Sequence, residues 1–321
     1  MATQGSKKNK SVAVVIPAFK VSAEIISVIQ EIDKSVSNIY VIDDKCPEKS
    51  GAKVEKLLKD KRIKVLFNES NLGVGGSTMR GYHEALKTEA TYVVKLDGDG
   101  QMDPKLISKF INALEKSGGD YAKGNRFANP EDIGTMPKMR IFGNLFLSFL
   151  AKFSTGYWNI FDPNNGFTVI KTNVLRELPL QKISNRYFFE SDMLFRLNLL
   201  QANVVDVPMS AIYGTEKSNL KISKTLVEFP YKHLRNFLKR IAYNYFVRDF
   251  NLASLQLVLS GIFLFFGILI GAADLLHAIS TETSMSVGIL ILVSILIISG
   301  LQLLLSFFTF DMNARNQRKF W

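Results

Sequence analysis

Two long apolar segments restrict what this chain can fold into. Residues 252–276 and 286–310 contain almost no charged side chains. A helix of ~20 apolar residues, rising ~1.5 Å per residue, is enough to cross a ~30 Å hydrocarbon layer. Neither segment shows a polar stripe, and both exceed the usual length of a globular helix. We therefore predict a transmembrane hairpin rather than two buried core helices.

The distribution of basic residues predicts how this hairpin is oriented. The loop between the segments, "HAISTETSM", contains no Lys or Arg. Basic residues lie outside the two segments, at Arg235, Lys239, Arg240, Arg248, Arg315, Arg318 and Lys319. The positive-inside rule then places both flanks, and so both termini, in the cytoplasm of a plasma-membrane protein. The start, "MATQGSKKNK", has no apolar core, so no signal peptide is predicted.

Composition narrows the class of partner. The net charge of +11 favours an anionic partner such as a phosphorylated substrate or a membrane surface. Nucleic acid is not expected, because no helix-turn-helix, zinc-finger or RNP pattern is present. The single cysteine, Cys46, excludes an intrachain disulfide, and the three histidines share no zinc-ligand spacing. The sequence leaves a homo-oligomer open.

The region before the hairpin predicts an α/β fold. Continuous apolar runs at 12–16, 39–43, 63–67 and 91–97 alternate with stretches of helical spacing near 22–34, 51–60 and 76–88. This alternation is typical of a mostly parallel sheet flanked by helices. The predicted parts are a flexible tail (1–10), an α/β domain (11–220), amphipathic juxtamembrane helices (221–251), the hairpin (252–310) and a basic tail (311–321). Residues 136–156 could form either a core helix or a helix in the membrane interface.

Acidic residues follow the fourth predicted strand, in the stretch "VVKLDGDGQMDP". Asp97 and Asp99 lie two residues apart on a glycine-containing turn, with Gln101 next to them. Mg²⁺ usually takes one or two protein carboxylates and completes its shell with water and substrate phosphates. We therefore predict that Asp97, Asp99 and Gln101 hold Mg²⁺ or Mn²⁺. Asp103 directly precedes Pro104 and a predicted helix, and is better interpreted as an N-cap.

Polar residues also follow the other three predicted strands, in "PAFK", "DDKCPE" and "NESNLGVGG". Ligands of doubly wound sheets bind beyond the carboxyl ends of the strands, so these groups are expected to meet. Gly73, Gly75 and Gly76 precede a predicted helix that carries Arg80, which suits a phosphate. The Walker and G-x-G-x-x-G patterns are both absent, which disfavours a P-loop ATPase and a Rossmann dehydrogenase.

Together these motifs resemble the family 2 glycosyltransferases of GT-A fold, and among them the polyprenyl-phosphate glycosyltransferases, such as dolichyl-phosphate mannose synthase and its bacterial glucosyl relatives. The resemblance rests on "VVIPAFK", "VIDD", "NLGVGGSTMRGYHEA", "LDGDGQMDP", "GNRF", "NNGFTVIK", "ESDMLFRL", "YGTEKSNLKISK" and the terminal hairpin. It implies a GT-A Rossmann-like sheet and a divalent metal. It also implies transfer of a hexose from a nucleotide sugar to a polyprenyl phosphate. Our hypothesis for this transfer is a single displacement that inverts the anomeric carbon.

The resemblance also implies roles for individual residues. Catalysis falls to Asp97, Asp99 and Asp192. Binding of the nucleotide sugar falls to Pro17, Phe19, Glu24, Asp44, Gly73, Arg80, Asp97, Asn165, Gly166 and Glu190. Binding of the acceptor phosphate falls to Arg126, Arg140, Lys221 and Lys224. Because a lipid phosphate is already ionised near neutral pH, Asp192 is expected to orient sugar hydroxyls rather than to remove a proton.

Departures from the family pattern leave some questions open. Phe19 lacks the hydroxyl of the usual tyrosine, and Cys46 occupies a small-residue position in the turn after the second strand. Both changes touch the expected nucleoside pocket, so the donor base can be uridine or guanosine. Two other functions are compatible with the sequence: a polysaccharide or glycolipid synthase with another acceptor, and a non-catalytic membrane scaffold. Metal-dependent binding of a nucleotide sugar would separate an enzyme from a scaffold.

Overall fold

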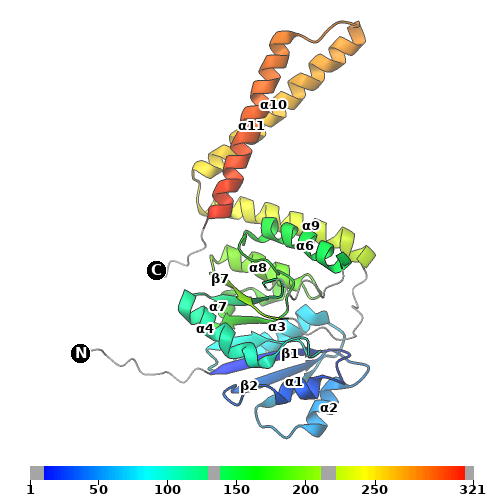
Figure 1. The fold of residues 1–321 in the computed structure, drawn as a ribbon, viewed down its shortest axis with the longest axis vertical. Helices are drawn as coiled ribbons and strands as arrows, with labels where there is room; N and C mark the ends of the chain where they lie inside the picture. Colours follow the sequence, from blue (N-terminus) through cyan, green and yellow to red (C-terminus); the bar gives the residue numbers. More distant parts are fainter. Residues whose placement is uncertain (1–10, 129–137, 211–221, 315–321) are drawn as a thin grey trace, which may run out of the picture. The chain divides into compact units, whose positions relative to one another are not determined.

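The computed structural model of the chain is shown in Figure 1 and describes residues 11–128, 138–210 and 222–314. The chain forms two compact units, one extending to Phe237 and one running from Leu238 to Arg315. The division falls within a long helix, α9 (Ile222–Ala242).

A seven-stranded sheet forms the centre of the first unit, in the order β3-β2-β1-β4-β6-β5-β7. The strands are β1 (Val12–Ala18), β2 (Asn38–Asp43), β3 (Ile63–Phe67), β4 (Tyr92–Lys95), β5 (Tyr121–Asn125), β6 (Thr168–Lys171) and β7 (Val204–Pro208). The first four strands are parallel, and β6 runs antiparallel to both of its neighbours. The predicted mostly parallel α/β sheet is confirmed.

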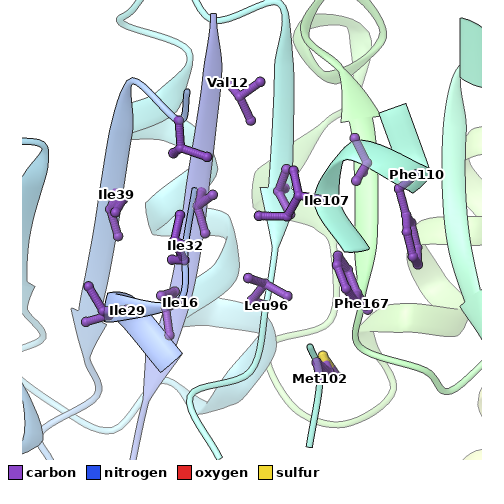
Figure 2. Close-up of a cluster of buried hydrophobic side chains, with 14 of the residues drawn as sticks. Val12, Ile16, Ile29, Ile32, Ile39, Leu96, Met102, Ile107, Phe110 and Phe167 are labelled. Carbon is purple, nitrogen blue, oxygen red and sulfur yellow. The ribbon is translucent and has the colours of Figure 1, made fainter. Parts of the chain in front are cut away.

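Helices cover both faces of this sheet (Figure 1). They are α1 (Ile25–Gln30), α2 (Ser50–Leu57), α3 (Gly73–Ala85), α4 (Ile107–Ser117), α7 (Thr172–Glu177) and α8 (Phe189–Leu199), whereas α6 (Lys138–Thr155) packs against α8. Alternate residues of β1 enter two different cores. Val14 and Ile16 pack with α1 and α4 in the cluster of Figure 2, whereas Ala13 and Val15 pack with α3 and α8. A strand buried on both faces must be apolar throughout, which explains the continuous run.

The structure refines several predicted boundaries. The fourth strand was predicted to reach Asp97 but ends at Lys95, so both aspartates of the motif lie beyond the sheet. β3 lies at the edge of the sheet and is only partly buried, because its outer side lacks a neighbouring strand. The predicted strand pair near 204–214 yields β7, and its second half lies outside the described residues. Asp103 is confirmed as an N-cap, since its Oδ1 accepts a hydrogen bond from Lys105 N–H (2.9 Å).

Two long helices dominate the second unit, α10 (Leu252–Thr281) and α11 (Val287–Asn313). Both are long and apolar enough to cross a membrane, and few of their side chains are buried within the chain. Core helices of a soluble protein would be mostly buried. The helices pack closely where Ser260 Oγ donates a hydrogen bond to the carbonyl of Gly300 (2.9 Å). A hairpin of apolar helices at 252–276 and 286–310 is therefore confirmed.

A buried ion pair connects the end of α9 with the end of α11 in this second unit. Arg240 Nη1 and Nη2 lie 2.6 and 2.9 Å from the two carboxylate oxygens of Asp311. The hydroxyl of Tyr245, in the π-helix Tyr243–Arg248, donates to Asp311 Oδ1 (2.7 Å). Buried charges persist only when they are paired and hydrogen-bonded, and this carboxylate meets both conditions.

We expect the single substitutions Arg240→Met and Asp311→Leu each to lower the free energy of unfolding by about 3–5 kcal/mol, because each leaves one buried charge without its partner. The double variant should lose clearly less than the sum, since apolar groups then replace both charges. Thermal unfolding of the wild-type protein, the two single variants and the double variant in detergent micelles gives the four values of this double-mutant cycle. Additive losses would show that the two side chains are not energetically coupled.

Candidate active site

The end of β4 places a carboxylate beside a buried lysine. Lys95 is the last residue of the strand, and its side chain is 1% exposed. Its Nζ lies 2.7 Å from Oδ1 of Asp97, whose side chain is 27% exposed. Leu96, between them, is buried in the core of the opposite face. Because successive side chains of an extended segment point to opposite faces of the sheet, Lys95 and Asp97 point to the same face.

Lys95 belongs to a polar row that crosses three strands. Thr168 of β6 lies opposite Lys95 of β4, and also opposite Lys123 of β5. Residues directly opposite each other in neighbouring strands share a face of the sheet. All three are buried. Neither lysine was singled out in the sequence. Lys95 could have been, because lysine is rarely buried and this one lies in a strand that was predicted to be buried on both faces.

Glu190, in the first turn of α8, interacts electrostatically with both lysines of this row. Burial raises the pKa of Glu190 to about 7, against the opposing effect of Lys95 and Lys123. Burial lowers the pKa of Lys123 to about 8, against the opposing effect of Glu190. Lys123 Nζ also donates to the carbonyl of Asn165 (2.5 Å). The structure thus brings Glu190 and Asn165 to the Lys95–Asp97 pair.

Gly166 closes over that pair. A Cβ atom at this position would lie 2.3 Å from Asp97 Oδ2 and 2.4 Å from Lys95 Nζ, so any side chain would displace one of them. Asn165, next to it, holds the turn by accepting a hydrogen bond from Phe167 N–H on its Oδ1 (2.8 Å). The structure therefore brings Gly166, and with it the "NNG" turn, against Asp97.

The turn after Asp97 can supply oxygen ligands. Asp99 Oδ1 accepts a hydrogen bond from Gln101 N–H (3.0 Å), and Gly100 has a φ of 73°, which favours glycine. No group of three or more His, Cys, Asp or Glu side chains that could hold a metal occurs within the described residues. Two carboxylates, completed by water and substrate phosphates, are a set that suits Mg²⁺. Asp97 and Asp99 therefore fit a metal that arrives with a diphosphate.

Asp44 occupies the N-terminus of α3. Its carboxylate accepts hydrogen bonds from Leu72 N–H (2.7 Å) and Gly73 N–H (2.8 Å), and from Asn68 Nδ2 (2.7 Å). An internal carboxylate thus satisfies amides that a phosphate could otherwise have used. Arg80 donates to the carbonyl of Phe67 (2.6 Å) and to Asn68 Oδ1 (2.6 Å). These contacts fix the loop between β3 and α3.

The glycines of "NLGVGG" allow close packing of another segment. A Cβ atom at Gly75 would lie 2.2 Å from the carbonyl oxygen of Ser184, and one at Gly73 would lie 2.7 Å from that of Asn185. Gly73 also has a φ of 83°, in the left-handed region. The sequence suggested a phosphate cradle at these glycines, whereas the structure places the backbone of Ser184 and Asn185 against them.

The remaining donor-site residues lie around the carboxyl ends of β1 and β2. Pro17 lies in β1, the strand between β2 and β4. Phe19, two residues later, has an exposed ring. Glu24 approaches the Asp99–Gln101 turn, since a Cβ atom on Gly100 would lie 3.7 Å from Glu24 Cβ. Cys46 Sγ accepts a hydrogen bond from Lys20 N–H (3.1 Å), which joins the loops after β1 and β2.

One of the four expected acceptor-binding cations has a described side chain. Arg126 forms a two-pronged ion pair with the buried Asp162, with Nε–Oδ2 and Nη2–Oδ1 distances of 2.7 and 3.0 Å. Asp162 was not singled out in the sequence. Arg140 lies in α6 and Lys224 in α9, but their side chains lie outside the described set, and Lys221 lies outside the described residues.

Asp192 is turned away from the polar row. Its Oδ2 accepts from Ser184 N–H (2.9 Å) and its Oδ1 from Asn236 Nδ2 (3.2 Å). Helical residues two positions apart point about 200° away from each other, because each residue rotates the helix by ~100°. Only one of Glu190 and Asp192 can therefore face the strand ends, and Glu190 does so. The structure does not bring Asp192 to Asp97.

Comparison with known proteins gives consistent matches. The profile of the family described as "Glycosyl transferase family 2" matches residues 13–179. The UDP-N-acetylglucosamine–dolichyl-phosphate N-acetylglucosaminyltransferase of Methanococcus voltae is 28% identical, over 69% of this chain and 93% of that protein. The polyprenol monophosphomannose synthase of Mycolicibacterium smegmatis is 27% identical, over 54% and 66%.

A third relative and a solved structure extend the comparison. The dolichol-phosphate mannosyltransferase of Pyrococcus furiosus is 26% identical, over 71% of this chain and 64% of that protein. The glucosyl-3-phosphoglycerate synthase of Mycobacterium tuberculosis, solved with Mn²⁺, UDP and glucosyl-3-phosphoglycerate, has a TM-score of 0.53. That similarity is at 18% sequence identity and covers 72% of this chain and 80% of the other. It bears on the fold alone.

Proposed function

Since this chain belongs to glycosyl transferase family 2, we propose that it transfers a hexose from a UDP- or GDP-linked sugar to a polyprenyl phosphate. The observation that carries the proposal is the turn after β4 that carries Asp97 and Asp99, in a chain that also has two helices apolar enough to cross a membrane. Two relatives are named as transferases for dolichyl phosphate and dolichol phosphate, and a third is named as a synthase of polyprenol monophosphomannose. A lipid acceptor requires an enzyme that stays at the membrane.

The donor is proposed to bind along the carboxyl ends of β1, β2 and β4. The proposed residues for the nucleoside are Pro17, Phe19, Glu24 and Asp44, with Gly73 and Arg80 shaping the loop. Asp97 and Asp99, assisted by Gln101, would hold Mg²⁺ or Mn²⁺ against the diphosphate. The metal, when bound, offsets the negative charge that develops on the departing diphosphate.

The sugar is proposed to lie between Gly166 and α8. Gly166 is packed against the Asp97 carboxylate, and Asn165 forms the adjacent turn, so both residues would border the sugar. We assign to Glu190 the role of orienting sugar hydroxyls that the sequence suggested for Asp192, because Glu190 is the carboxylate coupled to Lys95 and Lys123. Lys95 then keeps Asp97 in one orientation.

The acceptor phosphate attacks without needing a general base, because it is already ionised near neutral pH. The chain's own contribution is positioning, which can supply a large part of a rate enhancement. Arg126, Arg140, Lys221 and Lys224 are the proposed cations for this phosphate. A single displacement at the anomeric carbon inverts its configuration. Both flanks of the hairpin, and so the site, are proposed to face the cytoplasm.

A donor and acceptor panel tests this function. We expect purified protein with Mg²⁺ or Mn²⁺ to convert polyprenyl phosphate to its hexosyl derivative with one of a series of UDP- and GDP-sugars, as identified by mass. Transfer only to another acceptor would favour a polysaccharide or glycolipid synthase. No metal-dependent binding of any nucleotide sugar would favour the scaffold.

A further inference from the structure

Asp192 joins α8 to two other parts of the first unit. It accepts hydrogen bonds from Ser184 N–H and from Asn236 of α9, at 2.9 and 3.2 Å. Asp192 and Asn236 are each 1% exposed. A buried carboxylate needs such donors, and hydrogen bonds to charged groups are the stronger ones. Asp192 therefore fixes the segment before α8 relative to α9.

The segment Ser184–Arg186 in turn fixes the start of α3. Gly76 N–H donates to the carbonyl of Asn185 (2.9 Å), and Arg186 Nη1 donates to Asn71 Oδ1 (2.6 Å). The close approach of Ser184 to Gly75 leaves no room for a shift toward α3. A displacement of this segment would consequently move residues 71–76.

Residues 71–76 are bound on their other side to Asp44. Its carboxylate accepts from Leu72 and Gly73, and its carbonyl accepts from Asn71 Nδ2 (3.2 Å). Asp44 follows β2 at the proposed nucleoside pocket. A continuous series of hydrogen bonds therefore runs from Asn236, through Asp192, Ser184–Arg186 and the start of α3, to that pocket.

α9 has a second polar attachment that does not lead to the pocket. His233 Nδ1 and Ser154 Oγ of α6 are hydrogen-bonded at 2.7 Å. Burial lowers the pKa of His233 to about 4, so its ring is neutral at pH 7. The opposite side of α9 exposes Tyr231 and Leu234. The helix thus has one face bound to the first unit and another that is exposed and partly apolar.

We infer that Asn236 and Asp192 are positioning residues for the nucleoside diphosphate of the donor, so that α9 is a part of the donor site. Neither residue touches the nucleotide, because both act through Ser184–Arg186 and the start of α3. The inference rests on the proposed function for the identity of the ligand. It goes beyond that function because the proposed function gives α9 a role only toward the acceptor phosphate, through Lys224, and none toward the donor.

Asn236→Ala and Ser154→Ala form a matched pair, since each removes one buried hydrogen bond of α9. In the full-length protein in detergent, we expect Asn236→Ala to raise the donor KM about five- to tenfold, as the loss of one buried hydrogen bond predicts. Its kcat at saturating donor and its acceptor KM should stay within about twofold. Ser154→Ala should lower the Tm and leave the donor KM unchanged. An unchanged donor KM in Asn236→Ala, or an equal rise in both variants, overturns the inference.

Hydrogen exchange tests the same connection without catalysis. Amides of 71–76 and 184–186 should exchange faster in Asn236→Ala than in Ser154→Ala. In the wild-type protein, UDP or GDP with Mg²⁺ should slow exchange around Asn236 as well as at 71–76, because coupling between sites is reciprocal. Protection at 71–76 without protection in α9 overturns the inference. If neither nucleotide binds, the proposed function fails, while the comparison of the two variants still decides the inference.

Discussion

Asp99→Asn is expected to lower kcat about 100-fold or more, whereas Asp103→Asn in the same motif should leave it unchanged. Asp99 lies at the turn where a metal would meet the diphosphate, and losing the stabilisation of a leaving group typically costs several kcal/mol of activation free energy. Asp103 caps the next helix through Lys105 N–H, and asparagine caps equally well. Both substitutions replace an aspartate by an asparagine. Asp103→Asn therefore controls for the loss of one negative charge from this motif.

The measurement is initial transfer rate at saturating donor across a series of Mg²⁺ concentrations. Asp99→Asn should also need more Mg²⁺ to reach half of its own maximal rate. Full activity of Asp99→Asn, with the wild-type dependence on Mg²⁺, would remove Asp99 from the donor site. An equal loss in Asp103→Asn would point to disruption of the turn instead.

Glu190→Gln is expected to lower kcat about 100-fold, with a much smaller effect for Asp192→Asn. Glu190 is buried beside Lys95 and Lys123, where a preorganised charge acts most strongly on a reacting group. Asp192 binds Ser184 and Asn236, so its substitution should act mainly on the donor KM. Steady-state kinetics with donor and acceptor varied separately distinguishes these effects.

The outcome for this pair of carboxylates also tests our reassignment. A loss of kcat confined to Asp192→Asn would restore the role that the sequence suggested for that residue. Lys105→Met serves as the control for expression and membrane extraction, because the side chain of Lys105 is exposed. Its kinetic constants should match those of the wild-type protein.

The sheet and the hairpin could be predicted because their signals are local. The continuous apolar run of β1 arises from burial on both faces, and the apolar composition of α10 and α11 is visible in any window of the sequence. The Asp97–Asp99 turn was placed correctly at a strand end for the same reason. These features depend on residues close together along the chain.

The polar row could not be predicted because it depends on pairing between distant strands. Lys95, Lys123 and Thr168 come together through the register of β4, β5 and β6, and β6 is inserted antiparallel between the other two. No short-range pattern encodes that register. The sequence analysis singled out the acids of this stretch and neither lysine.

The sequence could not distinguish the positions of Glu190 and Asp192 for a related reason. Both acids were recognisable, but which one faces the strand ends depends on the rotation of α8 about its axis. Likewise, Gly73 and Gly75 suggested a phosphate site in the sequence. In the structure they are covered by Ser184–Arg186, and this segment is too far away in the sequence for a local pattern to indicate the contact. In both cases the partner comes from a distant segment.

Transfer of labelled hexose into polyprenyl phosphate should be measured with Mg²⁺ and then with excess chelator. Wild-type protein is expected to label the lipid only when the metal is present, and Asp99→Asn is expected to label it poorly in either condition. Lipid labelling that is unaffected by both the chelator and Asp99→Asn would contradict the proposed metal-dependent transfer.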